Sequence, residues 1–260
     1  MKDNFLVPKS IDNIIESVLG PTAEEIGQDL RTLYIKGRDL ILQKAFKKLR
    51  NPKDGKRANL RVARDVFWNG SFTDEAICAE YFGGILAASR STDGKNDSGV
   101  FFVDIIKSMS SGQLRMHYII YRTLNKALIV NKEKKTLNPG QESEFQREKL
   151  FFPLLEIIEQ FGTEDLGMIL HGLHAKNLIG HFQTKSYKLE NNQEMPYLEV
   201  APTSLGVQLF AIANNMFSDW RRFSTIDFGD FDEVILPKFY AQSFDSLLEK
   251  IGIKKHDQNS

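Results

Sequence analysis

Cysteine is almost absent from this sequence, since Cys78 is the one cysteine among 260 residues. A single cysteine cannot form an intramolecular disulfide, and it excludes every zinc site that needs several cysteines. The neighbours Ile77, Ala79 and Phe82 are apolar within a predicted helix, so Cys78 is interpreted as a core residue and not as a nucleophile. The cysteine content also fits the reducing cytosol.

An excess of charge of either sign is missing too, because 34 Lys and Arg balance 34 Asp and Glu. The chain as a whole is therefore not a polyelectrolyte, and only a local patch could attract nucleic acid. No apolar run reaches the roughly 18 residues of a membrane-spanning helix, and the N-terminal stretch MKDNFLVPKS lacks the apolar core of a signal peptide. These absences predict a soluble, cytoplasmic protein without a membrane span.

Sequence signatures of enzymes are missing as well. The chain contains no P-loop, no GxSxG nucleophile motif and no dinucleotide fingerprint. Two acidic pairs, Asp74–Glu75 and Glu164–Asp165, stand at predicted helix starts, where the helix dipole explains them. We therefore expect no catalytic residue and no cofactor, and keep a nuclease with scattered carboxylates as an alternative.

Helical periodicity is what the sequence does contain. Its 260 residues, 42% of them hydrophobic, suffice for one large domain or two small ones with real cores. Apolar residues recur at helical spacing between polar turns that contain glycine or proline. Helices are predicted at residues 10–19, 21–49, 58–68, 73–90, 101–109 and 110–128, with Thr73 as the cap of the fourth. We assign residues 1–135 to an N-terminal helical domain.

The pattern changes after a polar linker at residues 131–144, which contains a Pro–Gly pair. Two helices are predicted at 147–161 and 163–179, and they precede a hairpin around Asn191–Asn192 and a helix at 203–217. Pro153 either kinks the first helix or marks its first turn, and Thr163 caps the second. Residues 140–218 are therefore predicted to form a small winged-helix-like α+β module with one β-hairpin. The fold class is mainly α, with this module following the helical domain.

Residues 219–260 are predicted to form an aromatic and acidic C-terminal segment. A flexible tail with this many aromatic side chains would be poorly soluble. We therefore favour an arrangement in which Trp220, Phe223, Phe228 and Phe231 reach back across the helical domain, against the alternative of two independently folding domains.

Several stretches together resemble the bacterial abortive-infection alpha family, which is associated with phage defence. They are LGPTAEEIGQDL, FTDEAICAEYFGGILAASRS, FFVDIIKSMSSGQLRMHYII, and NLIG followed by the hairpin and PTSLGVQLF. The resemblance covers roughly residues 18–215 and rests on the order of the motifs, each of which is weak alone. SGVFFVD lacks the His-Pro pair expected before the Phe, so no role of that pair is carried over. The resemblance implies a setting, phage exclusion, more than a chemistry.

The stretch HGLHAKNLIGH holds three of the five histidines of the chain. His171 and His174 share a helix face, but His181 lies beyond Gly180, and no Glu follows either helical His as in a zinc hydrolase. A structural zinc site needs four ligands, and a catalytic one needs at least three. We expect no metal here.

A cluster of positive charge is the strongest physical feature. Between Arg31 and Arg64 there are 12 Lys or Arg and only two acids, a net charge of +10. Such a segment could contact the phosphates of nucleic acid or an anionic membrane. The candidate nucleic-acid-binding residues are Lys44, Lys47, Lys48, Arg50, Lys53, Lys56, Arg57, Arg61 and Arg64.

The same cations could instead pair with acids from elsewhere in the chain. The acidic residues Asp227, Asp230, Asp232 and Glu233 are the obvious internal candidates. We therefore expect an antiviral, abortive-infection type of protein that acts by binding nucleic acid or a phage or host protein, with a homo-oligomer left open. The alternatives are an enzymatic effector and a DNA-binding regulator that uses the C-terminal module.

Overall fold

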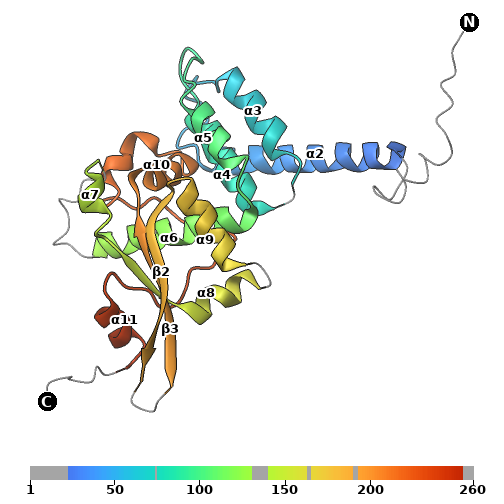
Figure 1. The fold of residues 1–260 in the computed structure, drawn as a ribbon. Coiled ribbons are helices and arrows are strands. Elements are labelled where there is room, and N and C mark those ends of the chain that lie inside the picture. Colours follow the sequence, from blue (N-terminus) through green and yellow to red (C-terminus); the bar gives the residue numbers. More distant parts are fainter. Residues whose placement is uncertain (1–22, 74, 131–139, 163–164, 190–192, 254–260) are drawn as a thin grey trace, which may run out of the picture.

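The computed structural model describes residues 23–73, 75–130, 140–162, 165–189 and 193–253 (Figure 1). It is mainly helical with one small antiparallel sheet, as the sequence predicts. The predicted helix at 10–19, the cap Thr163 and most of the linker lie outside the described residues. None of the described helices combines the length and the apolar character that crossing a bilayer requires.

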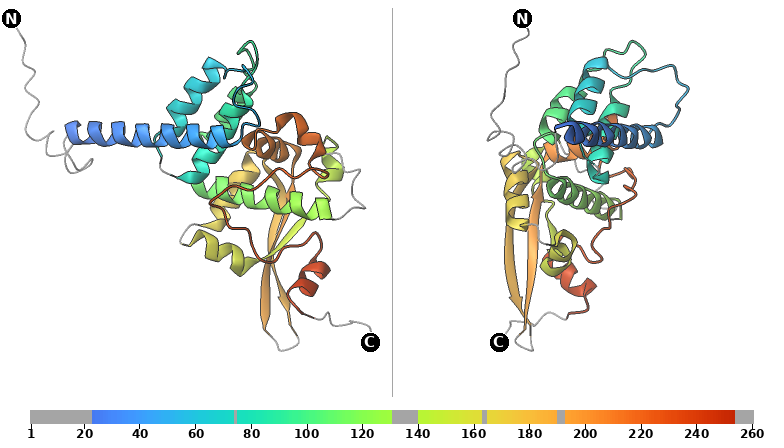
Figure 2. Two further views of the ribbon diagram at one scale, coloured as in Figure 1. Left: turned by 180° about the vertical axis from the view of Figure 1, so that it is seen from behind. Right: turned by 90° about the vertical axis from the view of Figure 1, so that its right-hand side faces the viewer.

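The N-terminal part of the described chain is helical throughout. Its helices are α2 (Ala23–Lys47), α3 (Leu60–Gly70), α4 (Ala76–Ala88), α5 (Gly99–Ile106) and α6 (Ser111–Val130). Their bounds agree with the predicted segments to within three residues. Helix α4 is central and packs against the other four helices. The N-terminal half of α2 extends beyond α3 and α4, away from the rest of the molecule (Figures 1 and 2).

The start of α4 corrects one prediction. Thr73 is not the cap of this helix, because α4 begins at Ala76 and Glu75 is its N-cap residue. The Thr73 hydroxyl accepts a hydrogen bond from the Glu75 backbone N–H at 3.1 Å, so it stabilises the turn before the helix. Small residues then let α4 approach its neighbours: a Cβ at Gly84 would lie 1.8 Å from the carbonyl oxygen of Ala213.

The predicted helix at 147–161 is wrong in its first half, and Pro153 does not kink a longer helix but is the N-cap residue of a shorter one. The structure has a short helix α7 (Glu142–Phe145), a strand β1 (Leu150–Pro153) and then α8 (Leu154–Phe161). Pro153 lacks an N–H donor and favours an extended residue before it, so it suits the start of a helix and not its interior. Alternate residues of β1 are buried, among them Phe152, which is the pattern of a strand with one face on the core.

The β-hairpin is confirmed. Strands β2 (Ile179–Lys188) and β3 (Glu194–Pro202) pair in antiparallel register, and β1 pairs with the other edge of β3, which gives the strand order β1-β3-β2. Helix α9 (Leu166–Ala175) precedes β2, and Asp165 caps it by accepting hydrogen bonds from two backbone N–H groups. Helix α10 (Ser204–Ala213) follows β3 and packs on α4 and α6.

The C-terminal segment runs across the helices instead of hanging free. It begins with a short 3₁₀ helix, η2 (Phe217–Arg222), and ends with α11 (Phe244–Lys250). Between them Phe223, Phe228 and Phe231 are buried, and the ring of Phe231 stacks on Tyr118 of α6 with centroids 4.3 Å apart. Residues from all three predicted regions thus belong to one cluster of buried side chains.

Candidate nucleic-acid interface

The predicted basic segment divides into two parts in the structure. The first part consists of Lys44, Lys47 and Lys48 at the C-terminal end of α2, and we call it the lysine cluster. The second part consists of the loop between α2 and α3 and the outer face of α3, and we call it the basic loop surface; its residues are Arg50, Lys53, Lys56, Arg57, Arg61 and Arg64. The two parts meet different partners.

The lysine cluster is engaged inside the protein. Lys44, with a side chain only 3% exposed, lies 2.7 Å from Oε1 of Glu80, and Lys48 lies 2.5 Å from Oε2 of the same carboxylate. Lys47 is half exposed and meets Asp232 of the C-terminal segment at 2.6 Å. Lys48 also lies 4.3 Å from the centre of the Phe231 ring, a cation–π contact. These contacts tie α2 to α4 and to the C-terminal segment.

The pKa values follow from this environment. Burial lowers the pKa of Lys48 to about 8, although the Glu80 carboxylate favours the charged form. Burial opposes the charge of Lys44 as well, but the hydrogen bond to Glu80 and the charge of that carboxylate outweigh it and raise the pKa. Hydrogen bonds from Lys47 and Lys44 lower the pKa of Asp232. Charges engaged in this way are poor partners for external phosphates.

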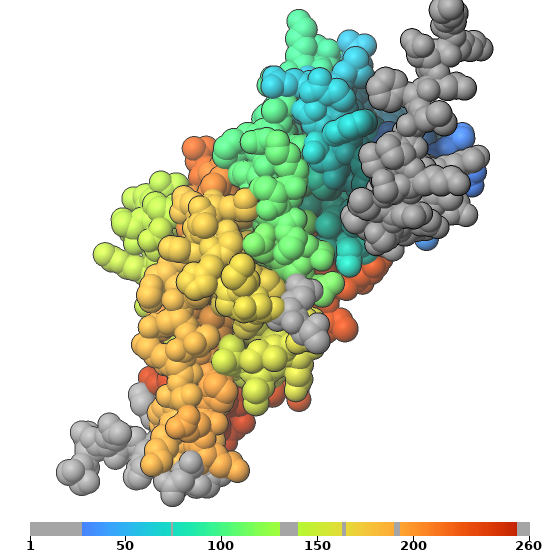
Figure 3. Space-filling model, turned by 45° about the vertical axis from the view of Figure 1, so that its right-hand side comes forward, coloured from blue at the N-terminus to red at the C-terminus, as the bar shows by residue number. Residues whose placement is uncertain are grey.

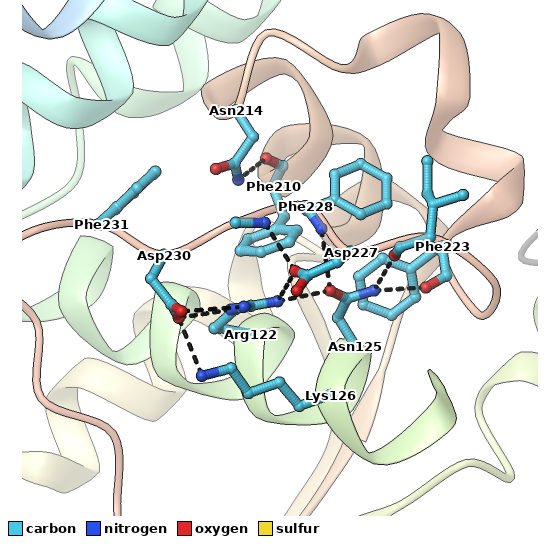
Figure 4. A network of polar contacts seen from close by, with 12 residues as sticks. Arg122, Asn125, Lys126, Phe210, Asn214, Phe223, Asp227, Phe228, Asp230 and Phe231 are labelled. Atoms are coloured by element: carbon cyan, nitrogen blue, oxygen red, sulfur yellow. Dashed lines mark hydrogen bonds and ion pairs between the residues drawn. The ribbon is translucent and has the colours of Figure 1, made fainter. Parts of the chain in front are cut away.

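Asp227 and Asp230 of the C-terminal segment meet a cation that the sequence did not reveal (Figure 4). Arg122 of α6 is buried, and its guanidinium donates to Asp227 at 2.5 Å and to Asp230 at 2.7 Å. Asn125, one turn further along α6, donates to the carbonyl oxygen of Phe223 at 2.6 Å. The hydrogen bond from Arg122 lowers the pKa of Asp230 to about 2. The segment is therefore held by two groups of ion pairs and by buried Phe rings.

The basic loop surface is held in place by the α4–α5 loop. The backbones of Arg57 and Ser91 exchange two hydrogen bonds of 3.1 and 3.0 Å. Arg90 donates to Asp54 at 2.5 Å and to the carbonyl oxygen of Lys56 at 2.9 Å. Arg90 thereby neutralises the one acid of the basic loop, and the loop has a fixed shape.

Most cations of the basic loop surface face solvent. Arg50, Lys53, Lys56 and Arg61 are exposed, and none of them forms an ion pair within the described part of the chain. The guanidinium of Arg57 donates to the carbonyl oxygen of Asp93. Residues 50–61 carry five cations and one acid, a net charge of +4. In the space-filling view α3 and its neighbours (cyan and green) lie at the end of the molecule opposite the hairpin (orange) (Figure 3).

The histidines of HGLHAKNLIGH have ordinary structural surroundings. His171 and His174 present their rings to Phe182 with centroids 5.1 and 5.9 Å apart, and His174 Nδ1 lies 3.0 Å from the carbonyl oxygen of Gly180. His181 is exposed on β2. Among the described residues, no three His, Cys, Asp or Glu side chains converge as metal ligands would.

The other residues considered as catalytic have structural explanations. Cys78 is half-buried in α4 beside the core, and burial raises its pKa to about 11, which disfavours the thiolate. Glu75 is the N-cap of α4, and Asp165 is the N-cap of α9. Asp74 and Glu164 lie outside the described residues.

Sequence patterns did not identify Glu80 as the partner of the lysine cluster or Arg122 as the partner of the C-terminal acids. Glu80 lies in the apolar run AICAEYFGGILAA, and Arg122 lies on the buried part of α6. A charged residue on the buried face of a helix is itself a signal, because burial without a partner is costly. The partner, however, lies far away in the chain: 36 residues separate Lys44 from Glu80, and 188 separate it from Asp232.

No protein-family model, curated protein or solved structure matches this chain. The resemblance to the abortive-infection alpha family therefore rests on the sequence motifs alone.

Proposed function

We propose that this protein acts by binding nucleic acid through the basic loop surface. The observation that carries the proposal is the exposure of Arg50, Lys53, Lys56 and Arg61 on a loop of fixed shape, with no ion pair in the described residues. Free cations displace counterions from phosphates, and a fixed loop loses little conformational entropy when it binds. The lysine cluster is left out of this interface because its charges are engaged internally.

The proposed biological setting is antiviral defence of the abortive-infection type. It is supported by the motif resemblance and by nothing in the geometry of the molecule. The test is a plaque assay on cells with and without the gene, together with survival of the infected culture. An intact basic loop surface is expected to be required: a Lys53→Glu, Lys56→Glu variant is expected to protect less than wild type at equal protein levels. Equal plaque counts with and without the gene across a panel of phages would contradict the setting.

A second proposal concerns the C-terminal module. The order β1, α8, α9, β2, β3, with a sheet of order β1-β3-β2, supports a winged-helix-like arrangement in which α8 and α9 precede the hairpin. In such motifs the second helix enters the major groove. Helix α9 has the sequence LGMILHGLHA, which contains no Lys or Arg. The module therefore supports nucleic-acid binding less well than the basic loop surface does.

Binding is tested by gel retardation at low salt with a duplex and a single strand of equal length. Wild-type protein is expected to retard at least one of them. The Lys53→Glu, Lys56→Glu variant is expected to bind several-fold more weakly. The matched control is Lys185→Glu, Lys188→Glu on the hairpin, which makes the same change in charge at the far end of the molecule. Loss of binding in the hairpin variant alone would assign the interface to the C-terminal module, and no retardation by wild type would overturn the function.

A further inference from the structure

The part of the basic loop surface on the outer face of α3 lies next to the exposed ring of Trp68. Arg61, Arg64 and Trp68 stand at positions i, i+3 and i+7, so they form one stripe along the helix. The opposite face is buried through Val62 and Val66. Trp68 is 71% exposed, which is unusual for so large an apolar ring. Two arginines and the exposed indole ring of Trp68 thus lie along one face of α3.

Trp68 belongs to a cluster of three aromatic side chains with Phe72 and Tyr34. Phe72 meets Trp68 edge to face, with centroids 6.2 Å apart and an interplanar angle of 83°. Tyr34 of α2 lies 5.5 Å from Phe72 on its other side. Phe72 is itself 41% exposed. The three rings come from α2, α3 and the turn after α3.

The base of this cluster is fixed by close backbone packing. A Cβ at Gly37 of α2 would lie 2.3 Å from the carbonyl oxygen of Ser71, so α2 approaches the end of α3 without a side chain between them. Gly70 is equally close to the ring of Phe82, at 2.6 Å. The aromatic platform is therefore built on rigid elements, and its exposed rings do not need to be ordered by a ligand.

From this geometry we infer that the stripe Arg61–Arg64–Trp68 binds single-stranded nucleic acid, with a base stacked on Trp68 and phosphates on the arginines. The inference rests on the proposed function and names its substrate class. A duplex hides the faces of its bases in the stack, whereas a single strand offers them to aromatic side chains next to a positive groove. Arg64 also contacts Asp65 at 2.6 Å on the surface, and a phosphate would compete with this exposed pair.

Charge is the reason for choosing nucleic acid over a protein as the occupant. The ends of the stripe are Trp68 and the basic loop, where Lys53, Lys56 and Arg61 have no ion pair within the described residues. An apolar protein surface would leave these cations desolvated and unpaired, which is costly. A single-stranded nucleic acid would place its phosphates beside the cations and a base on the ring of Trp68.

Tryptophan fluorescence reports directly on this site, because the chain has only two Trp residues. Trp220 is partly buried in η2 and carries Arg221 over its ring at 4.9 Å. In a Trp220→Phe background the emission comes from Trp68 alone. Titration with a single-stranded oligothymidylate is expected to quench this emission, and a duplex of equal length is expected to quench it much less.

The affinity measurement uses Trp68→Ala, with Trp220→Phe as the matched control and Trp68→Tyr as the conservative variant. Trp68→Ala is expected to weaken single-strand binding by roughly tenfold or more, since stacking on one aromatic side chain contributes strongly. Duplex affinity and melting temperature are expected to change little, because Trp68 is mostly exposed. Trp68→Tyr is expected to restore most of the single-strand affinity.

The outcomes separate this inference from the proposed function. Equal losses of single-strand and duplex affinity in Trp68→Ala, or no loss, would overturn stacking while nucleic-acid binding stands. A wild-type dimer in light scattering that Trp68→Ala dissociates, without any quenching by single strands, would show a protein interface and overturn the inference. Wild-type protein that retards neither single strand nor duplex would remove the function and the inference together.

Discussion

The lysine cluster and the basic loop surface have similar sequences and different environments. Both belong to a run of 34 residues that carries a net charge of +10. Lys44 and Lys48 share the buried carboxylate of Glu80, whereas Lys53 and Lys56 face solvent without an ion pair in the described residues. The difference teaches that the number of cations in a segment does not measure the charge it offers to a ligand. That charge depends on which acids the fold brings to it.

Deleting residues 219–260 is expected to have the largest effect, because it removes the segment that engages the lysine cluster and part of the shared core. The deletion removes the buried rings of Phe223, Phe228 and Phe231 together with Asp232. Removing one buried Phe side chain costs about 3–5 kcal/mol, so removing three approaches the entire stability of a typical domain. We expect aggregation in size-exclusion chromatography, while a chain ending at Ile253 stays monodisperse. A truncated protein with an unchanged melting temperature would contradict this.

Replacing Glu80 beside the lysine cluster and Asp54 in the basic loop compares how much each acid contributes to the free energy of unfolding. Glu80→Ala would leave two buried ammonium groups without their carboxylate, which is expected to cost about 3–5 kcal/mol of unfolding free energy. Asp54→Ala, on the loop side, removes a partly buried pair with Arg90 that involves only one carboxylate and one cation, and it is expected to change stability less. Urea unfolding measures both, and Glu80→Gln preserves the shape if the alanine variant does not fold. Equal stabilities of the Glu80 and Asp54 variants would show that the lysine cluster is not a structural ion-pair group.

Acid is expected to release the C-terminal segment. The pKa of Asp230 is lowered from 3.8 to about 2, mainly by the hydrogen bond from Arg122. A carboxyl with a lowered pKa stabilises the folded state above its unfolded pKa, and this contribution is lost as the pH falls through the folded value. Asp230→Asn is therefore expected to melt below wild type at pH 7 and to approach it between pH 4 and 2. A difference in melting temperature that does not depend on pH would argue against the ion pair.

Reversing Lys53 and Lys56 to Glu is expected to have the smallest effect on folding and a clear effect on binding. Both side chains are exposed, and surface substitutions of this kind change stability by less than about 0.5 kcal/mol. Removing one cation that binds a phosphate is expected to reduce the slope of log affinity against log salt by about 0.7 for a single strand. Affinities at several salt concentrations measure the slope. An unchanged slope would place the phosphates elsewhere.

Sequence patterns predicted the helices of the N-terminal part and the hairpin well, because these depend on neighbours a few residues apart. Apolar periodicity predicted α2, α3 and α4, and the two short extended runs of the sequence predicted β2 and β3. The failure at β1 has a nonlocal cause. Leu150 to Pro153 become a strand because β3, about fifty residues later, offers them an edge, and a single helix cannot run through Pro153.

The candidate interface was predicted only as a set of cations, and the structure divides that set. The sequence places Lys47 and Lys48 on a predicted helix and Lys53 in the following loop, but nothing local shows which of them meets an acid. The sequence did not indicate that Trp68 is exposed, because a tryptophan at helical spacing usually packs inward. Its stripe with Arg61 and Arg64 is defined only once Val62 and Val66 mark the buried side of α3.

The sequence by itself determined the helical class, the hairpin and the presence of a basic segment, since propensity, periodicity and charge are properties of neighbouring residues. The tertiary structure alone decided which cations are available to bind an external ligand. The charges of Lys44 and Lys48 are engaged in the interior because α4 brings Glu80 beside them, and Arg122 is engaged because the C-terminal segment returns across α6. A buried charge is stable only next to its partner, and partners that lie tens to hundreds of residues apart meet only after the chain has folded.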